Sequence, residues 1–152
     1  MNTAPVRSSR ALRHGRHWAR RLALQALYQW DLARQRPAEI VAQFAEDDNW
    51  SRADTAYFGE LVRGVTAQAD ALDARIAPYL DRPMAEVDPV ERAVLRIATY
   101  ELLHRLDVPF RVVIEEAVSL AAKFGAEGGH RFVNGVLDRL ARELRPFETG
   151  GS

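Results

Sequence analysis

The sequence predicts an all-α protein of one domain, and three observations support this prediction. Apolar residues recur at helical spacing along nearly the whole chain, and no short segment shows the period of two that marks a strand. The chain has 152 residues, of which 47% are hydrophobic, which is enough for one domain with an ordinary core. Prolines and capping residues divide the apolar pattern into six main helices, three on each side of a break at residues 81–87.

The first three helices lie before the break. The first runs from about Trp18 to Arg34, because its apolar side chains lie within about 60° of one direction when projected as a helix. Pro37 ends it and suits the first turn of a short second helix. Ser51, followed three residues later by an aspartate, is a capping signal for a third helix that reaches about Leu80.

The last three helices follow the break. Residues 88–91, with the sequence DPVE, supply a cap, a proline at the first helical position and a capping-box carboxylate. The apolar stripe of this fourth helix is wide, which predicts a central position. Pro109 opens the fifth helix, and Gly125 is expected to close it in the left-handed conformation. The sixth helix follows residues 128–129, and we interpret its Gly135 as a point of close helix approach.

These elements predict one domain with two flexible ends. We expect a flexible Arg-rich arm at residues 1–17, a helical domain at 18–146 and a flexible tail at 147–152. The break separates two helical subdomains, at about 18–80 and 88–146.

Charge is distributed unevenly along this net-neutral chain. Residues 1–30 contain six arginines and no acidic residue, so the other 122 residues balance 15 basic against 21 acidic side chains, a net charge of −6. Such a concentrated positive end is typical of proteins that bind nucleic acid, an anionic membrane face or an acidic protein. A solvated, disordered tail is the simpler interpretation.

Several classes of function are excluded or disfavoured. The absence of cysteine excludes disulfides and thiolate chemistry, and fits a reducing cytoplasm. No apolar run approaches the length of a membrane span or of a secretory signal. His14 and His17 could share a helix face but lack the further ligands that a metal site needs. There is no phosphate loop, paired acid and base, or recognisable nucleophile. We therefore expect a cytoplasmic protein that is not an enzyme and holds no metal or cofactor.

Two places combine basic and aromatic residues. Tyr28 projects away from the apolar stripe of the first helix, beside Arg21 and Gln25. A stacking ring, a guanidinium and an amide are the groups that recognise single-stranded RNA, although an ordinary surface tyrosine would look the same. Arg131 and Phe132 begin the sixth helix, where free backbone amides attract anions. Phe132 would also suit the core.

Glu101 projects among apolar side chains of the fourth helix. An unpaired charge is costly in that position. We therefore expect Glu101 to accept hydrogen bonds from a helix start or from an arginine.

A combination of motifs resembles the NusB family. The motifs are ALQALY at 23–28, VERAVLRIA at 90–98, YEL at 100–102, DVP at 107–109, EEA at 115–117, KFG at 123–125 and FVNGVLD at 132–138, within a resemblance that covers about residues 16–146. The family implies two three-helix bundles, which agrees with the helix count. It also implies a transcription antitermination factor that binds the boxA element of nascent ribosomal RNA with NusE, a small-subunit ribosomal protein, in an RNA polymerase antitermination complex.

The resemblance further implies site residues. Those expected to contact RNA are Arg16, Arg20, Arg21 and Tyr28, with Arg131 and Phe132 as neighbours; those expected to contact NusE are Glu91, Arg92 and Arg96. Gln25 joins the expected RNA contacts because of its position beside Arg21 and Tyr28 on the helix. Some relatives dimerise, so a homodimer stays open. The alternative function is a protein adaptor whose basic arm grips an acidic partner, and such an adaptor would show no dependence on RNA sequence.

Overall fold

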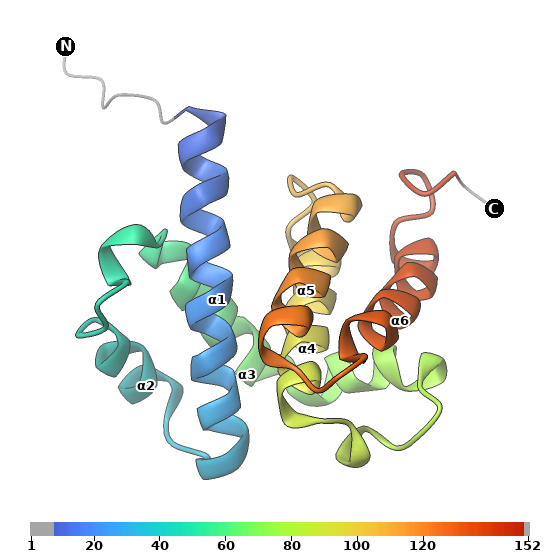
Figure 1. Ribbon diagram of the computed structural model, residues 1–152, viewed down its shortest axis with the longest axis horizontal. Helices are drawn as coiled ribbons and strands as arrows, with labels where there is room; N and C mark the ends of the chain where they lie inside the picture. The colour runs from blue at the N-terminus through green and yellow to red at the C-terminus, as the bar shows by residue number, and fades with distance from the viewer. Residues whose placement is uncertain (1–7, 151–152) are drawn as a thin grey trace.

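The computed structural model describes residues 8–150, and within them it contains the six predicted helices and no strand (Figure 1). The helices are α1 (Ser9–Ala33), α2 (Pro37–Phe44), α3 (Thr55–Ile76), α4 (Pro89–His104), α5 (Phe110–Phe124) and α6 (Gly129–Leu144). Short 3-10 turns occur at η1 (Trp50–Arg52), η2 (Ala77–Tyr79) and η3 (Met84–Glu86). The predicted all-α class is therefore confirmed.

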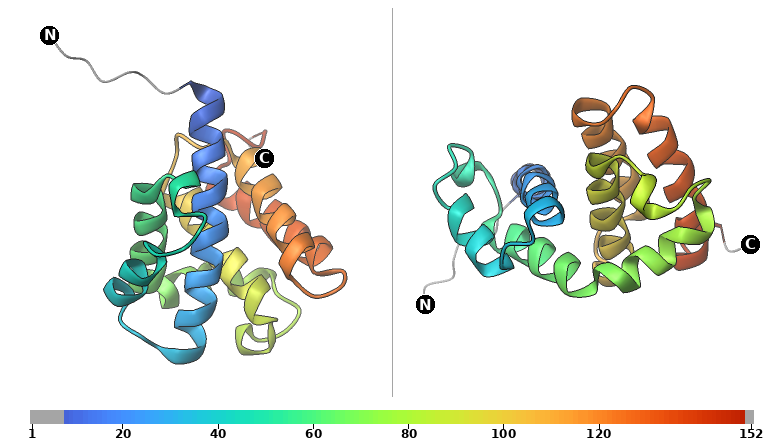
Figure 2. Two further views of the ribbon diagram at one scale, coloured as in Figure 1. Left: turned by 60° about the vertical axis from the view of Figure 1, so that its left-hand side comes forward. Right: turned by 90° about the horizontal axis from the view of Figure 1, so that it is seen from below.

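The helices pack as two groups of three. Each of α1, α2 and α3 contacts the other two, and each of α4, α5 and α6 does the same. The two groups meet where α4 packs against α1 and α3, and α3 runs from the first group toward the second (Figure 2). α3 bends at Gln68, whose φ of −117° and ψ of 15° are not helical.

α4 is the central helix of the molecule, as its wide apolar stripe predicted. Every side chain from Ala93 to Leu102 is buried. One continuous core links apolar side chains of all six helices, so the two groups share a single interior. Among the described residues, no helix is both long and apolar enough to span a membrane.

α1 begins nine residues before the predicted start at Trp18. The Ser8 hydroxyl caps it by accepting a hydrogen bond from the backbone N–H of Ala11 at 3.1 Å. Residues 9–17 are thus helical and were wrongly assigned to a flexible arm. The segment has little apolar periodicity because part of its inward face consists of arginines, such as Arg16, that meet carboxylates. Residues 1–7 and 151–152 of the predicted ends lie outside the described residues.

α3 begins later than predicted. Asp54, not Ser51, is its cap, and its side chain accepts from the backbone N–H of Tyr57 at 3.0 Å. Ser51 instead lies in η1. The backbone N–H of Asp54 donates to the carbonyl of Gly15 at 2.9 Å, which ties the start of α3 to α1.

The predicted start of α4 is confirmed in part. The Asp88 carboxylate accepts from the backbone N–H groups of Val90 and Glu91, at 2.9 and 3.3 Å. Glu91 does not complete a capping box, since its carboxylate accepts from the backbone N–H of Ala126 at 3.1 Å, in the loop between α5 and α6.

Two glycine predictions were wrong. Gly125 follows α5 with φ −85° and ψ −178°, an extended conformation. The left-handed residue of this loop is Gly128, with φ 78°. Gly135 faces open space, so it does not bring two helices together.

Candidate nucleic-acid interface

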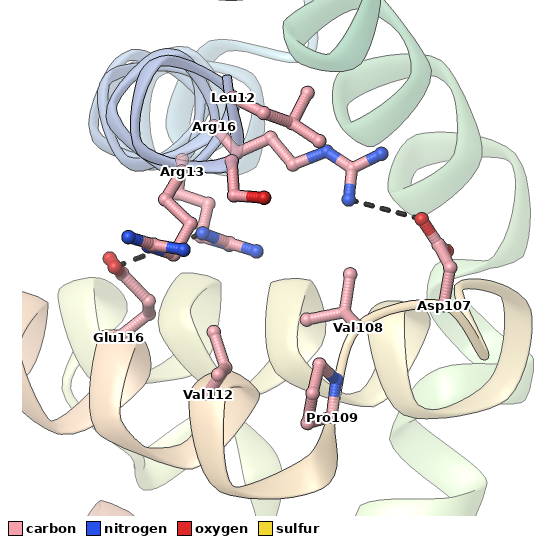
Figure 3. A pocket seen from close by; sticks show the side chains of 10 residues that line it. Leu12, Arg13, Arg16, Asp107, Val108, Pro109, Val112 and Glu116 are labelled. Atoms are coloured by element: carbon pink, nitrogen blue, oxygen red, sulfur yellow. Dashed lines mark hydrogen bonds and ion pairs between the residues drawn. The ribbon is translucent and has the colours of Figure 1, made fainter. Parts of the chain in front are cut away.

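α1 carries arginines on two different sides. Arg20 turns inward, toward α3, α4 and α5. Arg16 turns toward Tyr57 of α3 and, as Figure 3 shows, toward Asp107 in the loop between α4 and α5. Arg21, although adjacent in sequence to Arg20, lies 100° further round the helix and belongs to another surface. The two groups of side chains therefore have different surroundings.

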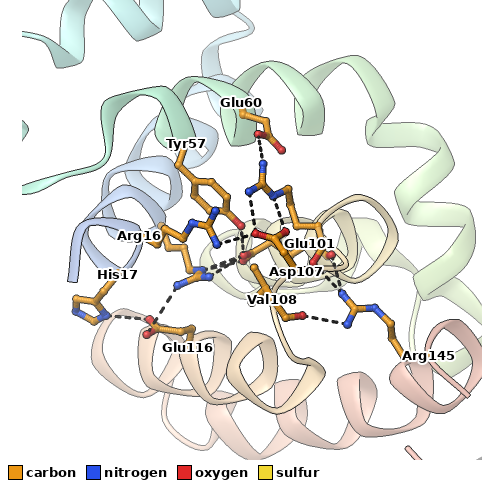
Figure 4. A network of polar contacts seen from close by, with 11 residues as sticks. Arg16, His17, Tyr57, Glu60, Glu101, Asp107, Val108, Glu116 and Arg145 are labelled. Atoms are coloured by element: carbon orange, nitrogen blue, oxygen red, sulfur yellow. Dashed lines mark hydrogen bonds and ion pairs between the residues drawn. The ribbon is translucent and has the colours of Figure 1, made fainter. Parts of the chain in front are cut away.

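Arg20 is only 3% exposed and pairs with Glu101, which is 1% exposed. Arg20 Nε donates to Glu101 Oε1 at 2.9 Å and Nη2 donates to Oε2 at 2.8 Å, while the Tyr57 hydroxyl donates to Oε2 (Figure 4). Burial alone would lower the pKa of Arg20, but the hydrogen bonds and charge of Glu101 outweigh it and raise that pKa. The prediction for Glu101 is confirmed. This pair removes Arg20 from the surface, and its contact with RNA stays a prediction that no observation here supports.

Arg16 lies at the edge of the same network. Its Nη1 donates to Asp107 Oδ2 at 3.1 Å, and its guanidinium carbon lies 4.6 Å from the centre of the Tyr57 ring. Arg105 also donates to Asp107. Burial would raise the pKa of Asp107, but the hydrogen bonds from Arg105 and Arg16 outweigh it and lower that pKa. Arg16 is thus mainly engaged within the protein.

Arg21, Gln25 and Tyr28 share the other surface, as predicted. Tyr28 is 39% exposed, which confirms that it points away from the core. Gln25 and Tyr28 line a shallow cavity of about 240 Å³ together with Phe124, at the end of α5. The structure therefore adds an aromatic ring from a second helix to the predicted residues.

Cations lie over the rings of this surface. The Arg21 guanidinium carbon is 4.7 Å from the ring centre of Trp18 and 5.1 Å from that of Phe124. Arg52 of η1 lies 5.1 Å from Trp18, and Lys123 Nζ lies 5.7 Å from Phe124. Such distances are typical of cation–π contacts.

We call this surface the aromatic-basic face; it comprises Trp18, Arg21, Gln25, Tyr28, Arg52, Lys123 and Phe124. Within residues 8–150, none of its three cations forms an ion pair. Sequence reasoning missed four members. Helical spacing could have joined Trp18 to Arg21, but only the tertiary fold brings Arg52 and Lys123 to α1.

The second predicted basic-aromatic cluster, Arg131 and Phe132, lies at the start of α6 and is not part of the aromatic-basic face. Arg131 is exposed at the start of α6. Phe132 is half-buried against the core, and the Arg82 guanidinium carbon lies 4.6 Å from its ring centre. A role for Arg131 and Phe132 in RNA binding stays a prediction.

The residues predicted to contact NusE are mostly buried. Glu91 is 4% exposed and Arg96 is 6% exposed. Arg96 donates to Asp73 through two nitrogens, each at 2.8 Å, and Arg92 Nε donates to Asp31 Oδ2 at 2.7 Å. Glu91 and Arg96 thus turn toward neighbouring parts of the protein, and the contact of Glu91, Arg92 and Arg96 with NusE stays a prediction.

The same ion pairs act on Asp31. Its side chain is 6% exposed, and burial alone would raise its pKa. The hydrogen bond from Arg92 and the charges of Arg96 and Arg92 outweigh burial, so the pKa of Asp31 is lowered. Asp31 lies on α1, whereas both arginines lie on α4, so these pairs join the two helix groups.

Comparison with known proteins identifies the family of the chain. The NusB family model matches residues 17–142. The transcription antitermination protein NusB of Xanthomonas campestris pv. campestris is 54% identical over 134 residues, which cover 88% of this chain and 84% of that protein. The chain belongs to the NusB family. NusB of Xanthomonas oryzae pv. oryzae is also 54% identical, over 132 residues that cover 87% of this chain and 85% of that protein.

Solved NusB structures share the fold. NusB of T. maritima superposes with a TM-score of 0.79 at 32% identity, and the match covers 90% of this chain and 96% of that one. A chain in the crystal structure of antitermination factors NusB and NusE in complex with double-stranded RNA gives a TM-score of 0.78 at 28% identity, covering 90% and 99%.

Proposed function

We propose that this protein is a transcription antitermination factor that binds RNA together with NusE. Membership of the NusB family and the likeness to a chain in a NusB–NusE–RNA structure support this function. The observation on the chain itself that carries it is the aromatic-basic face, where three cations without ion pairs among residues 8–150 lie beside partly exposed rings.

The chemistry of this face suits single-stranded RNA. Phosphates are attracted to Arg21, Arg52 and Lys123, and the ring of Tyr28 offers a stacking surface for a base. The amide of Gln25 can both donate and accept a hydrogen bond, which allows it to read a base edge. The function needs no catalytic group, because positioning an RNA in a larger assembly is a binding task.

The RNA that we propose is the boxA element of nascent ribosomal RNA, bound in the cytoplasm within the RNA polymerase antitermination complex. If this protein and NusE hold the same RNA through coupled contacts, each must tighten RNA binding by the other by the same factor. This linkage distinguishes the proposal from a protein adaptor, whose partner binding would not depend on RNA sequence.

A titration tests the function directly. RNA containing boxA and a scrambled RNA of the same length and composition are each titrated with the protein at one fixed salt concentration, with and without NusE. We expect modest affinity for boxA from the protein alone and tighter binding with NusE. Equal affinity for the two RNAs in the presence of NusE would contradict the proposal.

A further inference from the structure

The chain turns from α1 into α2 at Arg34, at the end of α1 opposite its arginine-rich start (Figure 1). Arg34 caps the helix with φ 54° and ψ 35°, and it is the only residue other than glycine with a positive φ within residues 8–150. Glycine adopts this left-handed conformation freely, whereas a residue with a Cβ is strained in it. The backbone alone therefore favours glycine over the arginine that stands there.

The side chain of Arg34 rests on an indole ring and stays open to solvent. Its guanidinium carbon lies 4.1 Å from the ring centre of Trp30, which is typical of a cation–π contact. The side chain is 62% exposed, and its one ion pair within residues 8–150 is a long contact of 3.6 Å to Asp31. Arg92 already holds that carboxylate at 2.7 Å. Arg34 is thus a cation held at the surface with little compensating charge.

A cavity of about 490 Å³ lies beside Trp30, between the first turn of α2 and the middle of α3. Its size is within the range of about 300–1,000 Å³ that small-molecule sites occupy. Pro37 and Ala38 of α2 and Ala67 of α3 give it apolar walls, and Arg63 of α3 lines it as well. Among the described residues, no carboxylate lines this cavity. It is therefore apolar within and positive at its edge.

Two further arginines of this region lack counter-charges. Arg36, next to Pro37, and Arg63 are both exposed, and neither forms an ion pair within the part of the chain that the structure describes. Together with Arg34 they concentrate positive charge where α1, α2 and α3 meet. We call the site formed by Trp30, Arg34, Arg36, Pro37 and Arg63 the α1–α2 corner. It shares no residue with the aromatic-basic face.

We propose that the α1–α2 corner is a second contact site for single-stranded RNA and takes nucleotides that flank boxA. A base stacks on the guanidinium of Arg34 and covers the apolar cavity beside it, while neighbouring phosphates pair with Arg36 and Arg63. The left-handed conformation of Arg34 is tolerated because it keeps the guanidinium on Trp30, in position to receive a base. The inference rests on the proposed function, since it lengthens the RNA that α1 binds.

The chemistry of the corner favours RNA over an acidic protein segment. Arginine guanidinium planes are among the surfaces on which unpaired RNA bases stack. A carboxylate instead pairs with the edge of a guanidinium and leaves its exposed face uncovered. Several cations without counter-charges also suit a polyanion, because each phosphate that is neutralised adds to the affinity.

The corner lies within reach of the aromatic-basic face. Tyr28 and Arg34 are six residues apart, about 9 Å along the helix axis. Leu32 is exposed and projects on the same side of α1 as Tyr28, whereas Trp30 projects on the opposite side. A strand that stacks on Tyr28 can therefore pass Leu32 and round the end of α1 to reach Arg34 within a few nucleotides.

Arg34→Gly and Arg63→Gln test the site, with Arg75→Gln as the matched control. Arg75 is an exposed arginine of α3, about three turns beyond Arg63, that does not line the cavity. Each protein is titrated with an RNA that holds boxA alone and with the same RNA extended by a run of uridines at its 5′ or its 3′ end, over a series of salt concentrations. A poly-glutamate peptide is the probe for an acidic protein segment. Thermal unfolding reports on the fold of each variant.

We expect one of the extended RNAs to bind the unsubstituted protein about threefold to tenfold more tightly than boxA alone. Arg34→Gly and Arg63→Gln should each lose most of this gain and keep their affinity for boxA alone within about twofold, whereas Arg75→Gln should keep the gain. Arg63→Gln should also lower the salt slope for the extended RNA by about 0.7. Because glycine relieves the left-handed strain, Arg34→Gly should melt no earlier than the unsubstituted protein, which a purely structural role for Arg34 would not allow.

Equal affinity for boxA alone and for both extended RNAs would overturn the inference, as would a gain that both corner variants keep. Poly-glutamate binding that is lost in Arg34→Gly, without any gain from extension of the RNA, would assign the corner to an acidic protein segment instead. After either result the proposed function remains supported if boxA is preferred over scrambled RNA in the presence of NusE. Absence of that preference in the unsubstituted protein would contradict the proposed function itself.

Discussion

Glu101 and Arg20 are buried together between the two helix groups, and each would be costly to bury alone. The carboxylate accepts from both Arg20 and Tyr57, so its two oxygens are satisfied. Burial would raise the pKa of the Tyr57 hydroxyl, and the negative charge of Glu101 raises it further, which keeps this hydroxyl protonated as a donor. The pair is thus a structural element that fixes α1 against α4.

The substitution Glu101→Gln should therefore destabilise the fold. The substitution leaves the Arg20 charge buried without a counter-charge. Removal of one partner of a buried ion pair typically lowers the unfolding free energy by about 3–5 kcal/mol. Chemical denaturation measures the change. The double variant with Arg20→Gln should lose less than the sum of the two single losses. An unchanged midpoint in Glu101→Gln would show that the pair contributes nothing.

Single-helix projection explains which residue predictions succeeded. It placed Tyr28 away from the core and Glu101 within it, because each direction follows from the apolar stripe of the residue's own helix, α1 for Tyr28 and α4 for Glu101. It could not place Arg20 or Arg96, since a long arginine at the side of a stripe faces inward only when a neighbouring helix offers a carboxylate. That carboxylate comes from Glu101 for Arg20 and from Asp73 for Arg96, both distant in sequence.

Helix starts differ in how visible they are in the sequence. The start of α4 was predictable because Asp88 and Pro89 are local signals that act within one turn. The start of α1 was missed because Ser8 is followed by arginines rather than by an apolar stripe. The aromatic-basic face was found only in part, since Arg52 and Lys123 reach it from other elements.

The Asp88 cap should contribute measurably to the stability of α4. Asp88→Ala removes the acceptor for the N–H groups of Val90 and Glu91 and should cost about 0.5–2 kcal/mol of unfolding free energy. Ser8→Ala is the comparison and should cost less unfolding free energy, because Ser8 caps the exposed end of α1, where the first turn can unwind without disturbing the core. A larger loss for Ser8→Ala than for Asp88→Ala would contradict this ranking.

Across the whole molecule, arginines of α4 tie the two helix groups together. Asp31 of α1 meets Arg92 and Arg96, and Arg96 also meets Asp73 of α3. The arginines that the sequence concentrates near its start are divided between the interior and the surface. Arg16 and Arg20 serve interior contacts, whereas Arg21 stays on the surface.

Acid should weaken this junction. The pKa of Asp31 is lower in the folded protein than in the unfolded chain, so the unfolded chain binds the proton more readily. The stabilisation from Asp31 is therefore present above the unfolded pKa of about 3.9 and is lost as the pH falls through the folded pKa. Asp31→Asn should therefore lower the unfolding free energy at pH 7 by about 1–3 kcal/mol. As the pH falls below about 5, the Asp31→Asn variant should lose less unfolding free energy than the unsubstituted protein. An identical acid loss in the two proteins would contradict this role.

The central claim is that the aromatic-basic face of α1 binds RNA, and Tyr28→Ala in the complex with NusE tests it most directly. RNA affinity is measured over a series of salt concentrations, with Arg21→Gln as the matched charge variant. We expect Tyr28→Ala to cost about 1–3 kcal/mol of binding with an unchanged salt slope, because it removes stacking. Arg21→Gln should instead reduce the slope by about 0.7, the value for one phosphate contact on a single strand. The exposed position of Tyr28 predicts a stability change within about 0.5 kcal/mol. Unfolding of Tyr28→Ala, or RNA affinity that is untouched in the NusE complex, would contradict the account.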